Sequence, residues 1–142
     1  MLVKIKLLTA LLLVGAWLLT ACQTEQQLPG IQADANGVPY RVVSVDELQT
    51  MLEDKDFLMV NVHTPFEGNI PQTDLHLPYD EIEQNLSLLP ADKDARILIY
   101  CLTSGMAKLA VATLTAQGYT DIWMLEGGTS AWEEAGLTLE FE

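Results

Sequence analysis

Cys101 is the residue of this sequence whose type and position best suit chemistry. It follows residues 96–100, which have the apolar pattern of a strand, and it precedes a helical pattern over residues 107–117. A thiol between a strand end and a helix N-terminus lies where backbone N–H groups and the helix dipole can stabilise a thiolate. A cysteine after an apolar strand is also typical of a core residue, because free cysteine is among the most buried types.

The loop between Cys101 and this helix favours the chemical interpretation. Three of its residues are small or flexible, so a tight loop with inward-facing N–H groups is expected. Open α/β sheets also place their sites at the carboxyl edge, where Cys101 falls. We therefore expect the loop to bind a negatively charged sulfur species; its residues are Leu102, Thr103, Ser104, Gly105 and Met106.

The elements that must position this loop alternate between strands and helices. Ser44 with Glu47 has the pattern of a capping box, Pro90 stops a helix over residues 81–89, and Thr129 is expected to cap a short final helix. The sequence thus predicts an α/β domain with a largely parallel sheet. Its strands are expected at residues 41–43, 57–62, 75–77, 96–100 and 121–125.

Composition and charge narrow the class of function. The 142 residues include 49% hydrophobic and 19% charged residues, as in a globular domain, and the net charge is −13. Such an acidic chain repels nucleic acid and anionic headgroups, so we expect neither as a partner of the folded part. One cysteine and two separated histidines form no recognisable metal set, and no metal or cofactor is expected.

The N-terminus reads as an export signal. Residues 1–21 combine two early lysines with a short apolar core, and they end in Leu19-Thr20-Ala21-Cys22. This tetrapeptide resembles the bacterial lipobox, which implies a lipid on Cys22; an uncleaved anchor is the alternative. We expect a flexible tether over residues 22–39 and a domain over 40–142, exported and held on the extracytoplasmic side of a bacterial membrane. Position 23 is Gln, whereas an aspartate directly after the lipidated cysteine retains such lipoproteins in the inner membrane; this difference favours an outer membrane.

The domain resembles the rhodanese family over residues 40–137. The resemblance rests on the strand ending at Cys101, on Gly118-Tyr119 after the following helix, and on Leu125-Glu126-Gly127-Gly128 before Trp132. It implies a three-layer rhodanese-like fold with a central, mostly parallel sheet flanked by helices. It also implies a sulfurtransferase without cofactor, in which Cys101 accepts a sulfane sulfur as a persulfide and passes it to a nucleophile.

Departures from the family pattern bear on which sulfur donor this chain can use. Many rhodaneses have cations where this chain has Leu102 and Met106, and an Asp-x-Arg where it has Asn61-Val62-His63. We therefore expect poor use of thiosulfate, and a small sulfane-sulfur donor or a protein persulfide in its place. The related phosphatases have an arginine where Ala107 stands, so phosphatase activity is not expected.

Two further residues are candidates for an auxiliary role at the thiol. His63 could act as a base or orient the loop, although a histidine in a proline-containing turn is more often a local hydrogen-bonding residue. Lys108 is the cation closest to Cys101 in the sequence, and a solvated side chain is its alternative. Two other functions stay open: a persulfide carrier or partner-binding module without turnover, and a redox-sensing thiol.

Overall fold

Six strands form one sheet in the computed structural model, which describes residues 28–141. Their order across the sheet is β1-β2-β6-β5-β3-β4, and every neighbouring pair is parallel except β1 with β2. The mostly parallel sheet expected from the sequence is confirmed. The strands are β1 (Ile31–Ala35), β2 (Val38–Val43), β3 (Leu58–Asn61), β4 (Leu75–His76), β5 (Ile97–Tyr100) and β6 (Ile122–Leu125).

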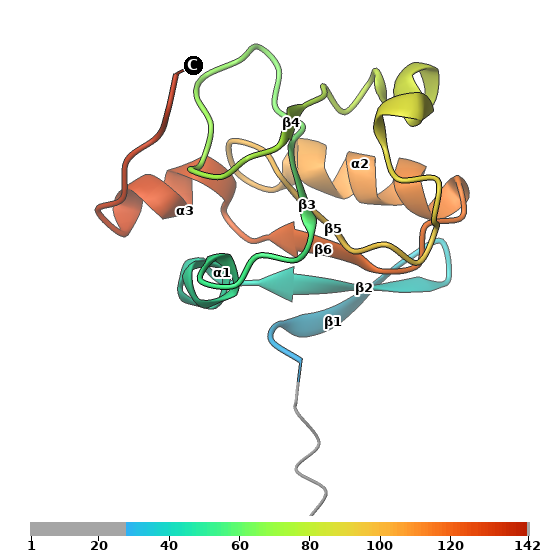
Figure 1. Cartoon of the computed structure of the whole chain (residues 1–142), viewed down its shortest axis with the longest axis horizontal. Coiled ribbons are helices and arrows are strands. Elements are labelled where there is room, and N and C mark those ends of the chain that lie inside the picture. Colours follow the sequence, from blue (N-terminus) through green and yellow to red (C-terminus); the bar gives the residue numbers. More distant parts are fainter. Residues whose placement is uncertain (1–27, 142) are drawn as a thin grey trace, which may run out of the picture.

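Helices cover both faces of this sheet and complete three layers (Figure 1). On one face, α2 (Gly105–Ala116) and the 3-10 helix η1 (Ile82–Leu88) pack on a buried cluster that includes Cys101. On the other face, α1 (Val45–Leu52) and α3 (Gly128–Glu134) pack on a second cluster around Trp123. Strands buried on both faces explain the uninterrupted apolar runs of β5 and β6.

A hairpin at the start of the sheet corrects the predicted tether. β1 pairs with β2 across a turn at Asn36-Gly37, where both residues have positive φ and the Asp34 carboxylate accepts the Gly37 N–H. The prediction of a flexible tether up to Pro39 is therefore wrong from Ile31 onward. The polar side chains of β1 lie exposed at a sheet edge, so no apolar period marked it, but the Asn-Gly pair was a usable hairpin signal.

The predicted capping box at α1 is present and also fixes the chain before β1. The Ser44 hydroxyl accepts the Glu47 N–H, while Glu47 Oε2 accepts the Ser44 N–H at 2.8 Å. Glu47 Oε1 accepts the Gly30 N–H at 2.8 Å, and these backbone hydrogen bonds lower the pKa of the Glu47 carboxyl. The Arg41 guanidinium donates to two more backbone carbonyls just before β1. Residues 28–30 are thus fastened to the domain.

Two helix predictions need correction. Residues 81–89 form a 3-10 helix rather than an α-helix, with a kink at Asn85, whose side-chain amide donates to the Glu81 carbonyl. Such a side-chain bond competes with regular helix formation. The last helix begins at Gly128 with left-handed Gly127 as its N-cap, so Thr129 lies inside the helix and does not cap it.

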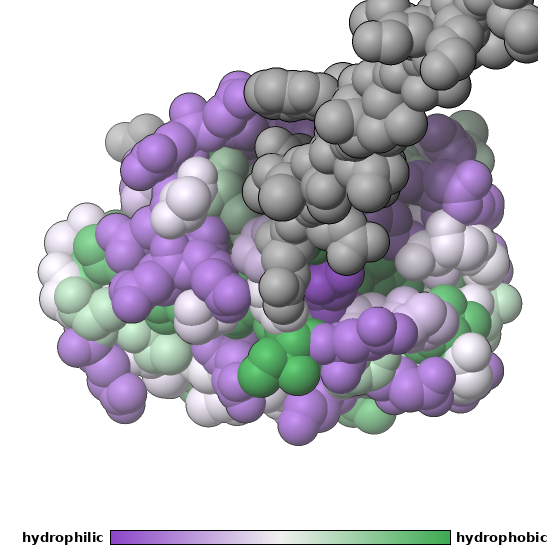
Figure 2. Space-filling model, turned by 90° about the horizontal axis from the view of Figure 1, so that it is seen from below, coloured by the Kyte–Doolittle hydropathy of each residue, from purple (hydrophilic) through white to green (hydrophobic). Residues whose placement is uncertain are grey.

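The surface and the N-terminus bear on the membrane prediction. Figure 2 shows a face on which hydrophilic residues predominate and apolar residues are scattered, in keeping with the acidic composition. In the described part of the chain, no helix is long and apolar enough to span a bilayer. The predicted signal segment and Cys22 lie outside the described residues.

Candidate active site

Cys101 lies directly after β5, at the carboxyl edge of the parallel strands. Its residue is 1% exposed and belongs to the cluster on the α2 face, with the sulfur beneath the first turn of that helix. The backbone N–H of Ala107 donates to Cys101 Sγ at 3.4 Å. A partial positive charge at a helix N-terminus therefore meets the sulfur directly, as expected for a site that stabilises a thiolate or persulfide anion.

The loop after Cys101 carries a run of unused hydrogen-bond donors. None of the five backbone N–H groups from Leu102 to Met106 has an acceptor within residues 28–141. With the Ala107 N–H they form six consecutive donors, which we call the sulfur cradle (residues 102–107). Successive N–H groups around a tight loop are a general device for binding anions.

The start of α3 holds this loop from the other side. The Thr129 N–H donates to the Cys101 carbonyl and the Ser130 N–H to the Leu102 carbonyl, each at 2.9 Å. Both peptide bonds that carry these carbonyls are trans, so the N–H groups of Leu102 and Thr103 point away from α3. The contact with α3 therefore uses the carbonyls of the loop and leaves its donors for another partner.

Gly128 makes this contact geometrically feasible. Its φ is +56°, and a Cβ on it would lie 2.0 Å from the Cys101 carbonyl oxygen and 2.7 Å from that of Thr103. The neighbouring Gly127 N–H donates to the Ser104 hydroxyl at 3.0 Å, which fixes the far side of the loop. Glycine is required here because the two backbones approach too closely for any side chain.

The side chains of the loop contribute no charge. Leu102, Thr103 and Gly105 are exposed, while Ser104 and Met106 are partly buried. All five predicted loop residues lie in the segment that joins Cys101 to the first turn of α2. Backbone dipoles, and not cations, supply the positive potential of this loop.

Neither auxiliary candidate forms a recorded bond with the thiol within residues 28–141. Lys108 is exposed on α2, and no hydrogen bond or ion pair in residues 28–141 joins it to Cys101. His63 is buried, with its Nε2 2.7 Å from Glu67 Oε2, while its Nδ1 has no partner among the described residues. The His63 carbonyl also accepts the His76 Nε2–H at 2.7 Å. These bonds order the loop after β3, and none of them reaches the sulfur.

Several residues that hold the sulfur were missed in the sequence. Ala107 and the two residues after Gly128 act only through their backbone N–H groups, so their side-chain types give no signal. The Gly127-Gly128 pair, which is part of the family resemblance, brings the start of α3 against the backbone of the Cys101 loop. No group of three His, Cys, Asp or Glu side chains suited to a metal occurs in residues 28–141.

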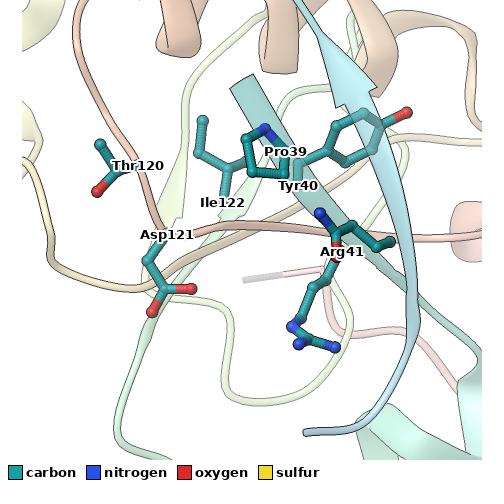
Figure 3. A pocket seen from close by; sticks show the side chains of 7 residues that line it. Pro39, Tyr40, Arg41, Thr120, Asp121 and Ile122 are labelled. Carbon is teal, nitrogen blue, oxygen red and sulfur yellow. The ribbon is translucent and has the colours of Figure 1, made fainter. Parts of the chain in front are cut away.

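A small pocket lies far from the thiol (Figure 3). Its volume is about 170 Å³, and it opens beside the start of β6 and the start of β2. Because parallel strands begin at the edge opposite to the one where they end, this pocket and Cys101 lie at opposite ends of the sheet. It is lined by Gln32, Pro39, Tyr40, Arg41, Thr120, Asp121 and Ile122.

Comparisons of the sequence point to one family. The model of the rhodanese-like domain matches residues 44–135. A curated relative described as a sulfurtransferase, from Allochromatium vinosum, is 36% identical over 94 residues, which are 64% of this chain and 85% of the relative. The tRNA uridine(34) hydroxylase of Escherichia coli is 27% identical over 105 residues, 67% of this chain and 30% of that protein.

Solved structures agree with this assignment. A rhodanese-like domain protein from Staphylococcus aureus has a TM-score of 0.58 and 33% identity, with 70% of this chain and 98% of that one covered. A rhodanese-related protein from Thermoplasma volcanium, at 24% identity, has the same fold with a TM-score of 0.61, over 72% of this chain and all of the other. The matched domain model, the Allochromatium relative and the shared three-layer fold show that this chain belongs to the rhodanese-like domain family.

Proposed function

We propose that this chain is a membrane-tethered, extracytoplasmic sulfurtransferase that carries sulfane sulfur as a persulfide on Cys101. The observation that carries the proposal is the sulfur cradle: the Ala107 N–H donates to Cys101 Sγ, and the five N–H groups between them have no acceptor within residues 28–141. Family membership and the Allochromatium sulfurtransferase, 36% identical, support the reaction type.

The reaction takes place in two balanced steps. The Cys101 thiolate attacks the outer sulfur of a donor persulfide, the S–S bond of the donor breaks, and the donor leaves as a thiolate while Cys101 holds the sulfur. An acceptor thiolate then attacks that outer sulfur, and the electron pair of the broken bond returns to Cys101 Sγ. No net oxidation occurs and no cofactor is required.

The cradle stabilises the charged intermediate. A persulfide anion adds one sulfur beyond Sγ, towards the N–H groups that have no acceptor within residues 28–141. Hydrogen bonds to a charged group contribute roughly 1.5–3 kcal/mol each, so two or three of them would favour the persulfide anion substantially. The 1% exposure of Cys101 means that attack by an acceptor falls on the outer sulfur rather than on Sγ.

The donor is expected to carry little negative charge or to belong to a protein. Leu102 and Met106 leave the loop without a cation, and the whole chain has a net charge of −13. Thiosulfate is a dianion, and the long-range field of such a chain repels it. A small organic persulfide or a protein persulfide is therefore the better donor, and polysulfide serves as a strongly reactive reference donor.

The membrane tether is proposed from the lipobox-like sequence that ends at Cys22. Lipid on this residue would keep the domain on the extracytoplasmic side of a bacterial membrane. Expression of the full chain in a bacterium with a radioactive fatty acid tests this: label in the chain, and none in Cys22→Ala, would support it. Equal label in both, or none in either, would refute lipidation of Cys22.

Intact-mass spectrometry of the reduced full chain in detergent tests the chemistry. The chain is offered thiosulfate, a small organic persulfide or polysulfide, with Cys101→Ser as the control. We expect a gain of one sulfur from the last two donors only, absent in the control and lost again to cyanide or a thiol. Gain without release would favour the persulfide carrier, and no gain from any donor would favour a partner-binding module.

A further inference from the structure

A groove lies along α2, the helix that follows the thiol loop. It has a volume of about 400 Å³ and runs between α2 and the segment that leads into η1. One wall comes from the residues around the start of η1 and the other from α2. The lining residues are Tyr79, Asp80, Glu83, Leu109, Ala112 and Thr113. We call it the η1–α2 groove.

The α2 wall of the groove starts two residues after the helix position that contacts the sulfur. Ala107 donates to Cys101 Sγ, and Leu109 follows two residues later, about 3 Å further along the helix axis. On the opposite wall, the Tyr79 N–H donates to the Val62 carbonyl, and Val62 packs in the same buried cluster as Cys101. Both walls of the groove therefore start from elements that contact the thiol region.

Two leucines of this region have no core partner. Leu109 is 55% exposed and Leu102 is 36% exposed, and neither belongs to the two buried clusters. Met106, between them in the sequence, is partly buried and packs against the cluster that contains Cys101. Leucine on the exposed flank of a helix next to a reactive loop provides apolar area that a partner could cover.

The rim of the groove is acidic. Asp80 and Glu83 are exposed, and neither forms an ion pair within residues 28–141. Lys108 is the cation next to the groove in the sequence, and it follows Ala107 on the exposed side of α2. Two unpaired carboxylates on a chain of net charge −13 fit a cationic partner and repel nucleic acid or an anionic lipid surface.

We propose that the η1–α2 groove docks a basic, leucine-containing segment of the partner protein whose cysteine receives the sulfur from Cys101. This inference rests on the proposed function and names its partner class. The partner's thiolate attacks the outer sulfur of the Cys101 persulfide, the bond to Sγ breaks, and the partner becomes the persulfide. A small thiol undergoes the same step without using the groove.

Two synthetic peptides serve as probes. Each has twelve residues with one cysteine and two leucines, and they differ in carrying either three lysines or three glutamates. The full chain in detergent is loaded with sulfur from polysulfide, and transfer to each peptide and to free cysteine is followed by mass spectrometry. We expect the lysine peptide to react at least about tenfold faster than the glutamate peptide at low salt, with the difference shrinking as salt is added.

A pair of matched double variants locates the effect. Asp80→Asn with Glu83→Gln removes the acidic rim, and Glu133→Gln with Glu134→Gln removes the same charge from exposed positions on α3. The first pair should slow transfer to the lysine peptide about three- to tenfold and leave transfer to free cysteine unchanged. The second pair should leave both rates within about twofold. Leu109→Ala should slow the lysine peptide about threefold, from lost apolar contact.

Binding of the peptide tests docking apart from sulfur chemistry. Fluorescence anisotropy of the labelled lysine peptide with Cys101→Ser should give a Kd that weakens about three- to tenfold in the Asp80/Glu83 variant only. If Cys101 never gains sulfur, the proposed function fails and this binding measurement still decides the docking. If sulfur is transferred but the groove variant behaves like the α3 variant in rate and binding, docking is overturned and the proposed function stands.

Discussion

Gly128→Ala should disturb the sulfur cradle (residues 102–107) without changing Cys101 itself. The added Cβ would lie 2.0 Å from the Cys101 carbonyl oxygen, whereas real Cβ contacts closer than 3.0 Å essentially never occur. The alanine Cβ is fixed to the backbone of α3 and the oxygen belongs to the backbone of the loop, so neither atom can rotate away. The loop and α3 must separate by about an ångström or more, which changes the direction of the loop N–H groups.

The cost can be assembled from the contacts that would break. A non-glycine residue at positive φ costs about 1–2 kcal/mol. Loss of the two hydrogen bonds from Thr129 and Ser130 to the loop carbonyls adds about 1 kcal/mol each. We expect Gly128→Ala to lower the free energy of unfolding by about 3–4 kcal/mol and the melting temperature by about 15 °C.

Gly136→Ala provides the matched control. Gly136 also has a positive φ, of +80°, but a Cβ there would meet nothing within 4 Å. Gly136→Ala should therefore lower the free energy of unfolding only by the cost of a non-glycine residue at positive φ, about 1–2 kcal/mol, and leave sulfur loading unchanged. The assays are thermal unfolding and the rate at which polysulfide adds one sulfur to Cys101, measured by intact mass on chains that are still folded at the assay temperature.

The two variants decide the reasoning by comparison. Slow loading in Gly128→Ala, with normal loading in Gly136→Ala, would show that the position of the loop backbone matters and not stability alone. Equal stability and equal loading in both would refute the clash and the role of α3 in holding the loop. A destabilised Gly128→Ala that loads sulfur at the normal rate would refute the cradle as the source of thiol reactivity.

Three further predictions concern single groups. Burial raises the pKa of Tyr100 to about 12, so the free energy of unfolding should stay constant below pH 10 and fall as pH rises towards 12. Tyr100→Phe should remove this fall. It should also lower the free energy of unfolding, measured in urea, by about 1–3 kcal/mol, because the Ile70 N–H loses its acceptor. Glu47→Gln should lower the free energy of unfolding at pH 7 by no more than about 1 kcal/mol. The difference from the parent chain should vanish as pH falls below 4.5, because a carboxyl group whose pKa is lowered in the fold stabilises the fold only while it is ionised. Met106→Arg should raise the rate of loading from thiosulfate about tenfold at low salt, and an unchanged rate would contradict the electrostatic account of donor choice.

The sequence predicted most of the parallel layer because its signals are side-chain patterns. Apolar runs marked β3, β5 and β6, and Ser44 with Glu47 marked the start of α1 by a hydrogen-bonding pattern that the structure contains. Parallel strands buried on both faces give a strong and continuous signal. The edge hairpin was missed because the apolar residues of β1 are an exposed Ile31 and two alanines, which give only a weak strand signal beside the turn.

The sequence pointed to the thiol and to the N–H groups of the loop over residues 102–106. It gave no sign of the N–H groups of Ala107, Thr129 and Ser130, because backbone donors are shared by every residue type. An auxiliary role of His63 stays a prediction. Its described bonds go to Glu67 and neighbouring backbone, which are matters of loop order.

The hairpin of β1 and β2 also determines how the sheet ends. β4, at one margin, offers only two residues for pairing, and β1 occupies the other margin with a short strand that carries the charge of Asp34. Exposed strand margins invite edge-to-edge aggregation, which short length and charge suppress. A chain shortened to begin at Tyr40 would lose β1 and the first third of β2 and would leave the apolar remainder of β2 as an open margin. Solubility of the domain therefore depends on a segment that precedes the residues matched by the family model.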